Sequence, residues 1–306
     1  LLARLIIKPI KELTEAAAQL EAGDLSHRVS VDRADEIGQL AAAFNAMAGS
    51  LERQETLRRN MTSDIAHELR TPLANLYGYL EAIEDGLVNP DPAAIHSLME
   101  ETELLNQLVE DLQEISLADA GELRLDIQPT TLEAIIHATI ETLRPTAQSK
   151  SIALQVDLPD DLPQAAADPR RLAQILRNLL NNSLTHTPEY GRIVLSAESI
   201  EATSVPSMDK PGRLPSATPS SATSRFIQFQ IHDNGPGIEP EHQALVFHRF
   251  YRADAARART TGGSGLGLAI SKMLVEAQGG EIWLKSIVGA GTVVGFTLPL
   301  ANGRHS

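Results

Sequence analysis

The chain has 306 residues, a formal net charge of −14 and no cysteine. This length is enough for two or three domains, because a single hydrophobic core rarely grows past about 250 residues. The negative charge argues against a nucleic-acid-binding protein, whose surface would be basic. The lack of cysteine excludes disulfides, thiolate metal sites and thiol nucleophiles.

The first seven residues, Leu1 to Ile7, are mostly apolar and precede Lys8 and Pro9. A cationic, helix-initiating flank after such a segment is typical of the cytoplasmic end of a membrane span. An ordinary helix start is the alternative. We expect the remnant of a membrane helix, which would place the natural protein at the plasma (inner) membrane and this chain in the cytoplasm.

Two short helices with an extended connector are expected next. The first covers residues 10–22 and ends at Gly23, residues 25–31 form the connector, and the second helix begins at Asp35. In the second helix apolar residues alternate at steps of three and four, as in a coiled-coil seam: Ile37, Leu40, Phe44, Met47 and Leu51.

The same register continues through a polar stretch at residues 54–58 to Met61 and Ile65. One long helix is therefore expected to connect this region with the next. The polar stretch predicts a loose joint, which suits a relay with two helix-packing states.

Residues 64–73 read DIAHELRTPL. Glu68 follows His67 and Thr71 lies one turn beyond, so the three side chains can project from one side of a helix. This is a nucleophile with a base beside it. Pro72 bends or loosens the helix there, because it has no N–H to donate. An exposed helical histidine before a helix break is the structural alternative.

A turn is predicted around Gly86, Asn89 and Pro90, before a helix that begins near Pro92. The seam residues of this helix again recur at alternating steps of three and four positions: Ile95, Leu98, Thr102, Leu105, Val109 and Leu112. Two amphipathic helices bury little surface alone. We therefore expect a second copy of the chain to complete an antiparallel four-helix bundle, with His67 facing outward.

From about residue 121 short strands alternate with helices. Helices are expected at 132–150, 169–185 and 266–278, and strands at 123–127, 152–156, 192–197, 226–232, 281–286 and 292–299. Several strands neighbour one another in sequence, which favours a mixed sheet with helices on one face. Residues 201–223, rich in Ser, Pro, Thr and Ala, are expected to form a mobile loop without chemistry.

Two polar clusters in this region suit a nucleotide. Asn178 and Asn182 are one turn apart on an otherwise apolar helix, and an amide can bind Mg²⁺ through oxygen or donate to a phosphate. Asp233 follows a strand and precedes Gly235 and Gly237. Its carboxylate can accept from an adenine amino group, and the glycines let a base approach. Each pattern alone is common as a coincidence or a turn.

Two glycine-rich runs follow. Residues 262–267 (GGSGLG) lead into a helix, and N–H groups at a helix start suit a triphosphate. The run has neither Walker A nor Rossmann spacing. Residues 289–292 (GAGT) precede the last strand, either as a hairpin turn or as a nucleotide-contacting edge.

Together these runs resemble the sensor histidine kinases of two-component systems. Residues 64–73 match the H-box, H-E-(L/I)-(R/K)-T-P, and the four later clusters match in order the N, G1, G2 and G3 boxes of the GHKL (Bergerat) ATP-binding fold. Residues 247–252 (FHRFYR) resemble the F box of the ATP lid. Pro9 and the DEIG run at 35–38 resemble points of a HAMP domain, a dimeric relay module.

The resemblance implies three domains: a HAMP relay over 1–55, a dimerisation and histidine-phosphotransfer domain over 56–118, and a catalytic ATP-binding domain over 121–303. The implied fold is a helical HAMP domain and dimeric four-helix bundle, then an α/β two-layer sandwich. It also implies a homodimer, ATP and Mg²⁺ as cofactors, and the receiver domain of a response regulator as partner.

The implied activity is that of an ATP-dependent protein-histidine kinase, which phosphorylates its own His67 and passes the phosphoryl group to an aspartate of the regulator. By this resemblance Glu68 is the general base and Thr71 serves regulator dephosphorylation. Asn182 holds Mg²⁺, while the other nucleotide-binding positions carried over are Asn178, His186, Asp233, Gly235, Gly237, Arg252, Gly263, Gly265, Leu266, Gly267 and Thr292.

One position departs from the family pattern. The N box usually continues N-A-x-(K/R)-(Y/F)-T-P, where this chain has Thr185 and His186 in place of the cation and the larger ring. Either ATP binds more weakly, or Arg249, Arg252 or Arg259 supplies the charge. Two other functions stay open: a kinase-inactive phosphatase or scaffold, and a GHKL ATPase of the gyrase, chaperone or mismatch-repair type, which has no need of His67.

Overall fold

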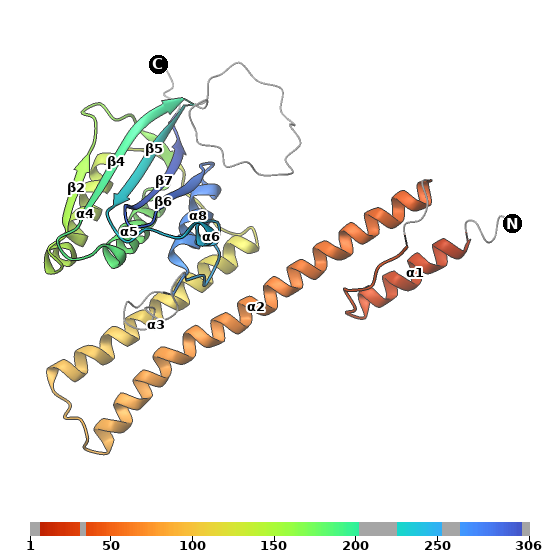
Figure 1. The fold of residues 1–306 in the computed structure, drawn as a ribbon, viewed down its shortest axis with the longest axis horizontal. Helices are drawn as coiled ribbons and strands as arrows, with labels where there is room; N and C mark the ends of the chain where they lie inside the picture. Colours follow the sequence, from red (N-terminus) through yellow and green to blue (C-terminus); the bar gives the residue numbers. More distant parts are fainter. Residues whose placement is uncertain (1–6, 31–34, 202–224, 253–263, 302–306) are drawn as a thin grey trace. The chain divides into compact units, whose positions relative to one another are not determined.

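The structure is a computed structural model that describes residues 7–30, 35–201, 225–252 and 264–301. The chain forms two compact units, residues 1–101 (unit 1) and 102–306 (unit 2). Figure 1 traces their helices and strands. The division falls within a helix, so unit 2 contains the end of that helix together with the sheet.

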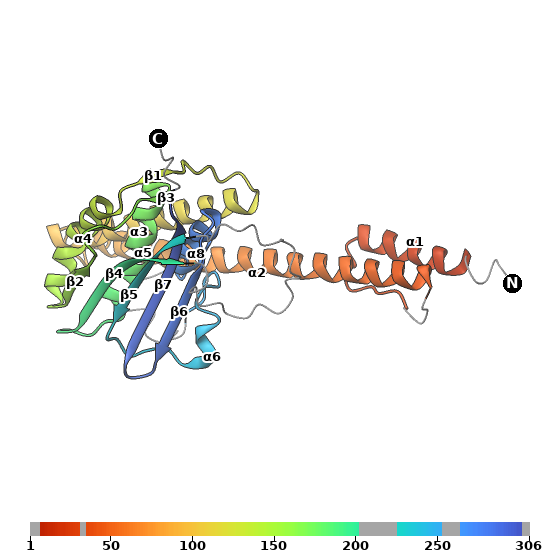
Figure 2. The ribbon, with the colours of Figure 1, turned by 90° about the horizontal axis from the view of Figure 1, so that it is seen from above.

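Unit 1 begins with α1 (Lys8–Glu21), which lies beside the first part of α2 (Glu36–Glu84) (Figures 1 and 2). Pro9 stands in the first turn of α1, and Gly23 follows the helix with φ of +96°. Asp35 caps α2 by accepting from the Gly38 amide at 3.1 Å. These ends agree with the expected boundaries, because cap residues mark them in the sequence.

The Asn45 side chain on α2 takes the place of a strand partner for the connector. The Asn45 amide oxygen accepts from the Val29 N–H at 2.9 Å, and its nitrogen donates to the Val29 carbonyl at 2.8 Å. This pair replaces a strand partner for the connector, whose backbone would otherwise need one.

Helix α2 runs for 49 residues without interruption, so the expectation of one long helix is confirmed. Pro72 lies inside it and is buried. The proline has no N–H to donate to the Glu68 carbonyl, and the predicted bending or loosening at this point stays a prediction. A helix break after the histidine, the structural alternative, is wrong.

Residues 85–91 form the expected turn, with Gly86 at φ +71°. Helix α3 (Pro92–Asp119) follows, and Asp91 accepts from the Ala94 amide at 2.8 Å. Across the hairpin the Asn75 amide donates to Glu101 at 2.8 Å. No described helix of the chain is long and apolar enough to span a membrane, and residues 1–6 of the expected membrane remnant lie outside the described part.

Unit 2 is built on a five-stranded mixed sheet in the order β2-β4-β5-β7-β6. Only β2 and β4 are parallel. The strands are β2 (Ala153–Asp157), β4 (Arg192–Glu201), β5 (Arg225–Asp233), β6 (Ile282–Ile287) and β7 (Gly291–Pro299). Figure 2 shows them side by side.

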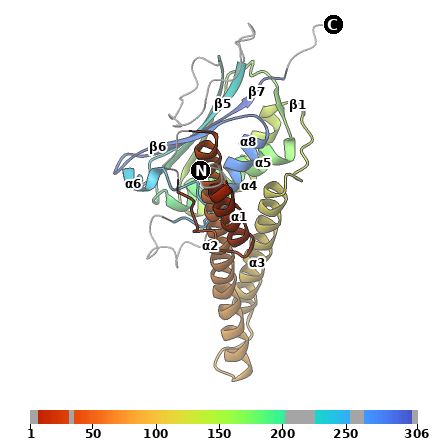
Figure 3. The ribbon, with the colours of Figure 1, turned by 90° about the vertical axis from the view of Figure 1, so that its right-hand side faces the viewer.

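Helices α4 (Leu132–Ser149), α5 (Pro169–His186) and α8 (Gly267–Ala277) cover one face of this sheet (Figure 3). The rings of Phe229 and Phe296 stack at 4.5 Å between neighbouring strands in this core. The short helix α6 (Pro240–Gln243) lies against β6. The predicted mixed sheet with helices on one face is confirmed.

Two short strands depart from the prediction. Residues 123–127 form no strand; instead β1 (Gln128–Thr130) pairs with β3 (Ala165–Ala167), which was not predicted. The Thr130 hydroxyl donates to the Ala167 carbonyl at 2.9 Å. Three alanines have no strand pattern, so only the fold explains this pairing. Residues 202–224, most of the expected loop, lie outside the described residues, between the antiparallel neighbours β4 and β5.

Candidate functional site

The histidine cluster lies on α2 of unit 1. The His67 side chain is exposed, Glu68 beside it is half-buried, and Thr71 is exposed one turn later. The Thr71 hydroxyl donates a long hydrogen bond of 3.4 Å to the His67 carbonyl. An exposed imidazole with an adjacent carboxylate can accept a phosphoryl group, because it is reachable and its proton has a nearby acceptor.

An apolar stripe continues beyond the histidine toward the hairpin turn. Leu73, Tyr77 and Leu80 recur at steps of four and three on α2 and are 60%, 69% and 54% exposed. On α3 of the same unit Ile95 and Met99 are also exposed. Large apolar side chains exposed in one stripe mark a surface for a protein partner.

The second cluster is built around Asp233 at the end of β5. Asp233 is 5% exposed, and its carboxylate accepts from the Gly235 amide at 3.0 Å and from the Ser183 hydroxyl at 3.2 Å. Thr292 stands opposite Asp233 on β7 and is also buried. A carboxylate with two donors keeps further acceptor capacity for an amino group of a ligand.

Glycines form the close contacts of this cluster. A Cβ on Gly237, whose φ is +77°, would lie 2.2 Å from the Ile287 carbonyl oxygen, and one on Gly235 would lie 2.8 Å from Asp233 Oδ1. A side chain at either position would displace the backbone or the carboxylate. Glycine is needed here for close approach of the protein's own backbone and the Asp233 carboxylate. The predicted approach of a base stays a prediction.

Ser286, which the sequence did not indicate as a site residue, links two segments at the edge of this cluster. The Ser286 hydroxyl lies 2.8 Å from that of Thr292 and accepts from the Ile238 amide at 2.8 Å. Ser286 stands on β6 opposite Thr292. Its only signal was its place in a strand beside the GAGT run.

Helices α5 and α8 pack together, and Asn178 links them. The Asn178 amide donates to the Gly267 carbonyl at 3.4 Å, at the first residue of α8. Asn182 is half-buried, and its amide has no hydrogen-bond partner within the described residues. Leu266 is buried and donates its N–H to the Ser264 hydroxyl at 3.3 Å. Gly265, at φ +67°, lies against the Phe250 backbone.

His186 lies beside the aspartate, since its carbonyl oxygen approaches Gly235. Loss of hydration lowers the pKa of His186, opposed by the Asp233 charge and assisted by Arg252 and Lys150. A lowered pKa keeps this imidazole neutral at pH 7. A neutral ring can stack on a base. His186 is partly shielded from water by its neighbours but is still exposed enough to be reached by one.

The structure also bears on which arginine could supply the positive charge that the N box lacks. Arg249 forms an ion pair with Asp119. Arg252 acts on the pKa of His186 and so lies near the cluster. Arg259 and Gly263 lie outside the described residues. That Arg252 supplies the positive charge missing from the N box stays a prediction.

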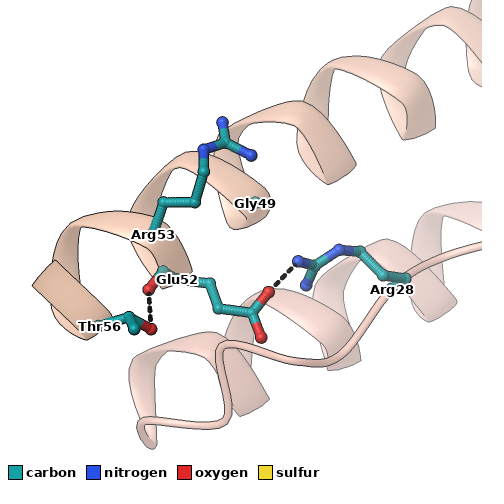
Figure 4. Close-up of a pocket in the computed structure, with 5 residues that line it drawn as sticks. All are labelled: Arg28, Gly49, Glu52, Arg53 and Thr56. Carbon is teal, nitrogen blue, oxygen red and sulfur yellow. Dashed lines mark hydrogen bonds and ion pairs between the residues drawn. The ribbon is translucent and has the colours of Figure 1, made fainter. Parts of the chain in front are cut away.

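A hollow of about 440 Å³ in unit 1 shares no residue with either cluster and is lined by Arg28, Gly49, Glu52, Arg53 and Thr56 (Figure 4). Arg28 and Glu52 point toward one another and form an ion pair of 2.5 Å, which holds the connector against α2. No cluster of three or more metal-binding His, Asp or Glu side chains occurs in the described parts of the chain.

The chain matches three domain families in order. These are the HAMP domain over residues 1–53, the His Kinase A (phospho-acceptor) domain over 57–121, and the histidine kinase-, DNA gyrase B- and HSP90-like ATPase over 167–302. The ATPase match covers the glycine-rich clusters and both asparagines. Residues 167–302 of unit 2 therefore belong to an ATP-binding domain of the GHKL type.

Similar proteins are histidine kinases. The chain is 37% identical over 300 residues to the signal transduction histidine-protein kinase BaeS of Escherichia coli strain K12, covering 98% of this chain and 59% of BaeS. It is 32% identical over 314 residues to the sensor histidine kinase MtrB of Mycobacterium tuberculosis strain H37Rv, covering 99% of this chain and 51% of MtrB. The chain thus spans little more than half of these relatives.

A solved structure agrees with these relatives. The histidine kinase AdeS of Acinetobacter baumannii superposes with a TM-score of 0.59 and 25% identity, covering 77% of this chain and 98% of that chain.

A phospho-acceptor hairpin followed by a GHKL domain defines the protein-histidine kinases. With its HAMP domain, the chain belongs to the HAMP-containing sensor histidine kinases of two-component systems. The predicted fold class is confirmed for the helical domains and the α/β two-layer domain. The three domain boundaries drawn from the sequence stay predictions.

Proposed function

We propose that the whole protein phosphorylates His67 from ATP and passes the phosphoryl group to an aspartate of a response regulator. One observation carries this proposal: an exposed imidazole beside a carboxylate stands on α2, in a chain whose other unit has a glycine-flanked, buried aspartate at a sheet end. The chain thus offers a candidate acceptor site and a candidate donor site for phosphotransfer.

In the proposed step an imidazole nitrogen of His67 attacks the γ-phosphorus of ATP. The bond between that phosphorus and the bridging oxygen breaks, ADP leaves with the electron pair, and Glu68 takes the imidazole proton. Phosphoryl transfer needs positioning and charge neutralisation more than covalent help. A single base next to the nucleophile is therefore sufficient on the acceptor side.

On the donor side we assign the adenine amino group to Asp233, with Gly235, Gly237 and Thr292 around it. Asn178, Gly265, Leu266 and Gly267 would face the phosphates at the start of α8, with Gly263 before them. His186 would lie against the base. Support comes from the burial of the carboxylate and from the N–H groups at a helix N-terminus, which favour anions.

The residues present fit a magnesium ion. Asn182 offers a half-buried amide oxygen without a hydrogen-bond partner in the described residues, and Mg²⁺ commonly takes one or two protein ligands with phosphates and water. When bound, the ion would neutralise phosphate charge. Asn182 would hold it, and Arg252 would supply the cation that Thr185 lacks.

We infer a homodimer and a regulator as partners. The seam residues Leu40, Met47 and Leu51 are exposed on α2, as a bundle with a second copy requires. The stripe of Leu73, Tyr77 and Leu80 would receive the regulator's receiver domain. We further propose, from the HAMP match, that the protein is associated with the plasma membrane, and that it binds no nucleic acid.

The direct test is incubation with ATP labelled at the γ-phosphate, followed by acid and alkali treatment. Phosphohistidine is lost in acid and survives alkali. We expect wild type to label and His67→Gln to stay unlabelled with ATP binding intact. His96→Gln is the matched control, because His96 is also an exposed helical histidine beside a glutamate, Glu100 at 3.4 Å.

A kinase-inactive phosphatase or scaffold would bind ATP and regulator without labelling, and a GHKL ATPase would hydrolyse ATP without needing His67. Alkali-stable label on His67→Gln would overturn the assignment of the acceptor. Absence of label on wild type with intact ATP binding would favour the scaffold.

A further inference from the structure

Lys150, the cap residue after α4, contacts the carboxyl end of α5. Its ammonium group donates to the Leu184 carbonyl at 2.9 Å. The last four carbonyl groups of a helix lack partners within the helix, and the carboxyl end carries partial negative charge. Lys150 is half-buried and Leu184 is buried. The lysine therefore satisfies a polar group of the helix end and offsets its charge.

The backbone of Lys150 makes a second contact, to the loop that follows α5. Its carbonyl accepts from the Tyr190 N–H at 3.4 Å. Tyr190 has φ of +63°, in the left-handed region that a bulky residue rarely adopts. Such a conformation persists only where the surroundings fix it, and it is common near functional sites. Lys150 thus contacts both the end of α5 and the loop after it.

Close packing at Gly191 joins this loop to the end of β5. A Cβ on Gly191 would lie 2.3 Å from the Thr187 methyl carbon and 2.8 Å from Asn234 Oδ1. Asn234, directly after Asp233, accepts through the same oxygen from the Arg192 N–H at 2.7 Å. Closely packed groups transmit displacement, so a movement of the loop would reach the residue beside Asp233.

His186 lies between the Lys150 contact and this packed region. It is the last residue of α5, two positions after Leu184. On its other side, a Cβ on Gly235 would lie 3.1 Å from the His186 carbonyl oxygen. The position of the imidazole therefore depends on where the carboxyl end of α5 is held.

The charge of Lys150 also acts on the imidazole. Loss of hydration is the main cause that lowers the pKa of His186, the Asp233 carboxylate raises it, and Arg252 and Lys150 lower it further. These three charged groups come from β5, from the segment after the F box and from the end of α4. A nearby ammonium group disfavours the imidazolium, so Lys150 helps to keep the ring neutral.

We propose that Lys150 is a positioning residue of the nucleotide site, which fixes the carboxyl end of α5 and with it the His186 ring that faces adenine. This inference rests on the proposed function, in which that ring lies against the base. Lys150 acts through the Leu184 carbonyl and the loop of residues 187–191, without touching the nucleotide. The phosphate end of the site, at the start of α8, does not depend on it.

The first test is Lys150→Met, which keeps the apolar stem and removes the ammonium group. Affinity for a non-hydrolysable ATP analogue, measured by isothermal titration, should fall about three- to tenfold as the helix end loses its cation. Lys150→Arg keeps a cationic donor and should stay within about twofold of wild type. Lys285→Met is the matched control, because Lys285 is an exposed lysine of the same sheet whose ammonium lies over the Trp283 ring at 5.3 Å.

A second ligand separates positioning of the ring from support of the whole fold. Inorganic triphosphate with Mg²⁺ has the phosphate chain of ATP and no base. Its affinity should be the same for wild type, Lys150→Met and Lys285→Met. A parallel loss of both ligands in Lys150→Met, together with a lower Tm, would show that the lysine only supports the fold and would overturn the proposal.

The third test reads the imidazole directly, without nucleotide. NMR titration of the histidine ring protons gives the pKa of His186, with His186→Gln identifying its signal. Lys150→Met should raise this pKa because a nearby positive charge is removed, whereas Lys150→Arg and Lys285→Met should leave it unchanged. A pKa of His186 that stays the same in Lys150→Met would place the ammonium group too far from the ring and overturn the proposal.

The outcomes separate this proposal from the proposed function. Wild type that binds the ATP analogue, with an unchanged affinity in Lys150→Met, overturns the role of Lys150 and leaves the kinase assignment intact. Wild type that binds no ATP analogue overturns the proposed function, and with it the role of Lys150 in holding a ring against adenine.

Discussion

The Ser183 hydroxyl donates to Asp233 Oδ2 at 3.2 Å, so a side chain of the N-box helix holds the carboxylate at the end of β5. Both residues are buried, at 1% and 5% exposure. The second carboxylate oxygen accepts from Gly235. Two donors from different elements fix the orientation of Asp233 before any ligand arrives, which favours tight and selective binding.

Asp233→Asn should lower ATP affinity by at least about tenfold, because a charge-assisted hydrogen bond to the adenine amino group, worth about 1.5–3 kcal/mol, is weakened. Isothermal titration with an ATP analogue measures this. Ser183→Ala should lower affinity less, since it only loosens the orientation. An unchanged titration of Asp233→Asn would remove adenine recognition from this residue.

Gly291→Ala should destabilise unit 2 and weaken ATP binding. Gly291 has φ of +115°, and a Cβ would lie 2.0 Å from the Asp233 carbonyl oxygen. Gly289→Ala is the matched control, since its φ is +78° but nothing lies within 4 Å. The control should cost about 1–2 kcal/mol from conformation alone. Equal losses of Tm in the two variants would show that the clash is relieved without consequence.

Asp111→Asn should stabilise the protein at pH 7. Burial raises the pKa of Asp111, opposed by a hydrogen bond from Gln107 and aided by Glu114. The folded state therefore binds the proton more readily than the unfolded state. The free energy of unfolding falls as the pH rises from the ordinary pKa of an aspartate to the raised pKa of Asp111 in the folded state. At pH 7 the charged carboxylate carries the full penalty, which asparagine removes while Gln107 can still donate to it.

The measurement is a pair of thermal melts. The Tm of Asp111→Asn should exceed that of wild type by roughly 1–3 °C at pH 7. This difference in Tm should vanish when the pH falls below 3.8, the ordinary pKa of an aspartate, because the carboxyl is then protonated in both states. Glu103→Gln removes the same charge from an exposed position and should leave Tm unchanged. A lower Tm for Asp111→Asn at pH 7 would mean that the carboxylate has a stabilising partner.

Periodic segments were predicted well because burial itself produces the period. Helix α2, the strands β4, β5 and β7, and the helices on the sheet all follow apolar spacing, and cap residues such as Asp35 and Gly23 mark helix ends. The strand β3 is three alanines, and its pairing with β1 depends on chain topology. No local pattern could show it.

The same contrast holds for the candidate site. Asp233 and the two asparagines could be predicted as candidates because their chemistry is visible within one short run of sequence. Ser286 and Lys150 were missed because each matters through a partner on another element, and Leu184 is 34 positions from Lys150. Long-range polar pairs leave no period in a single sequence.

Thr71→Ala should separate the two activities proposed for the histidine cluster. The Thr71 hydroxyl is exposed and makes a long hydrogen bond of 3.4 Å to the His67 carbonyl. Removing this hydroxyl should therefore change the stability of the helix little. The attack of His67 on ATP does not use this hydroxyl, and labelling should stay within about a few-fold of wild type. A hydroxyl one turn beyond the imidazole can instead orient a water toward a phosphoaspartate docked on the apolar stripe.

Loss of phosphate from the labelled cognate regulator should therefore slow substantially with Thr71→Ala, while Thr71→Ser, which keeps the hydroxyl, should retain it. Thr62→Ala is the matched control, as Thr62 is another exposed threonine of α2. If Thr71 only packs beside Pro72, the alanine variant will instead show a lower Tm and a parallel fall in labelling and dephosphorylation. That parallel loss would defeat the assignment, because a water-orienting role affects the dephosphorylation step alone.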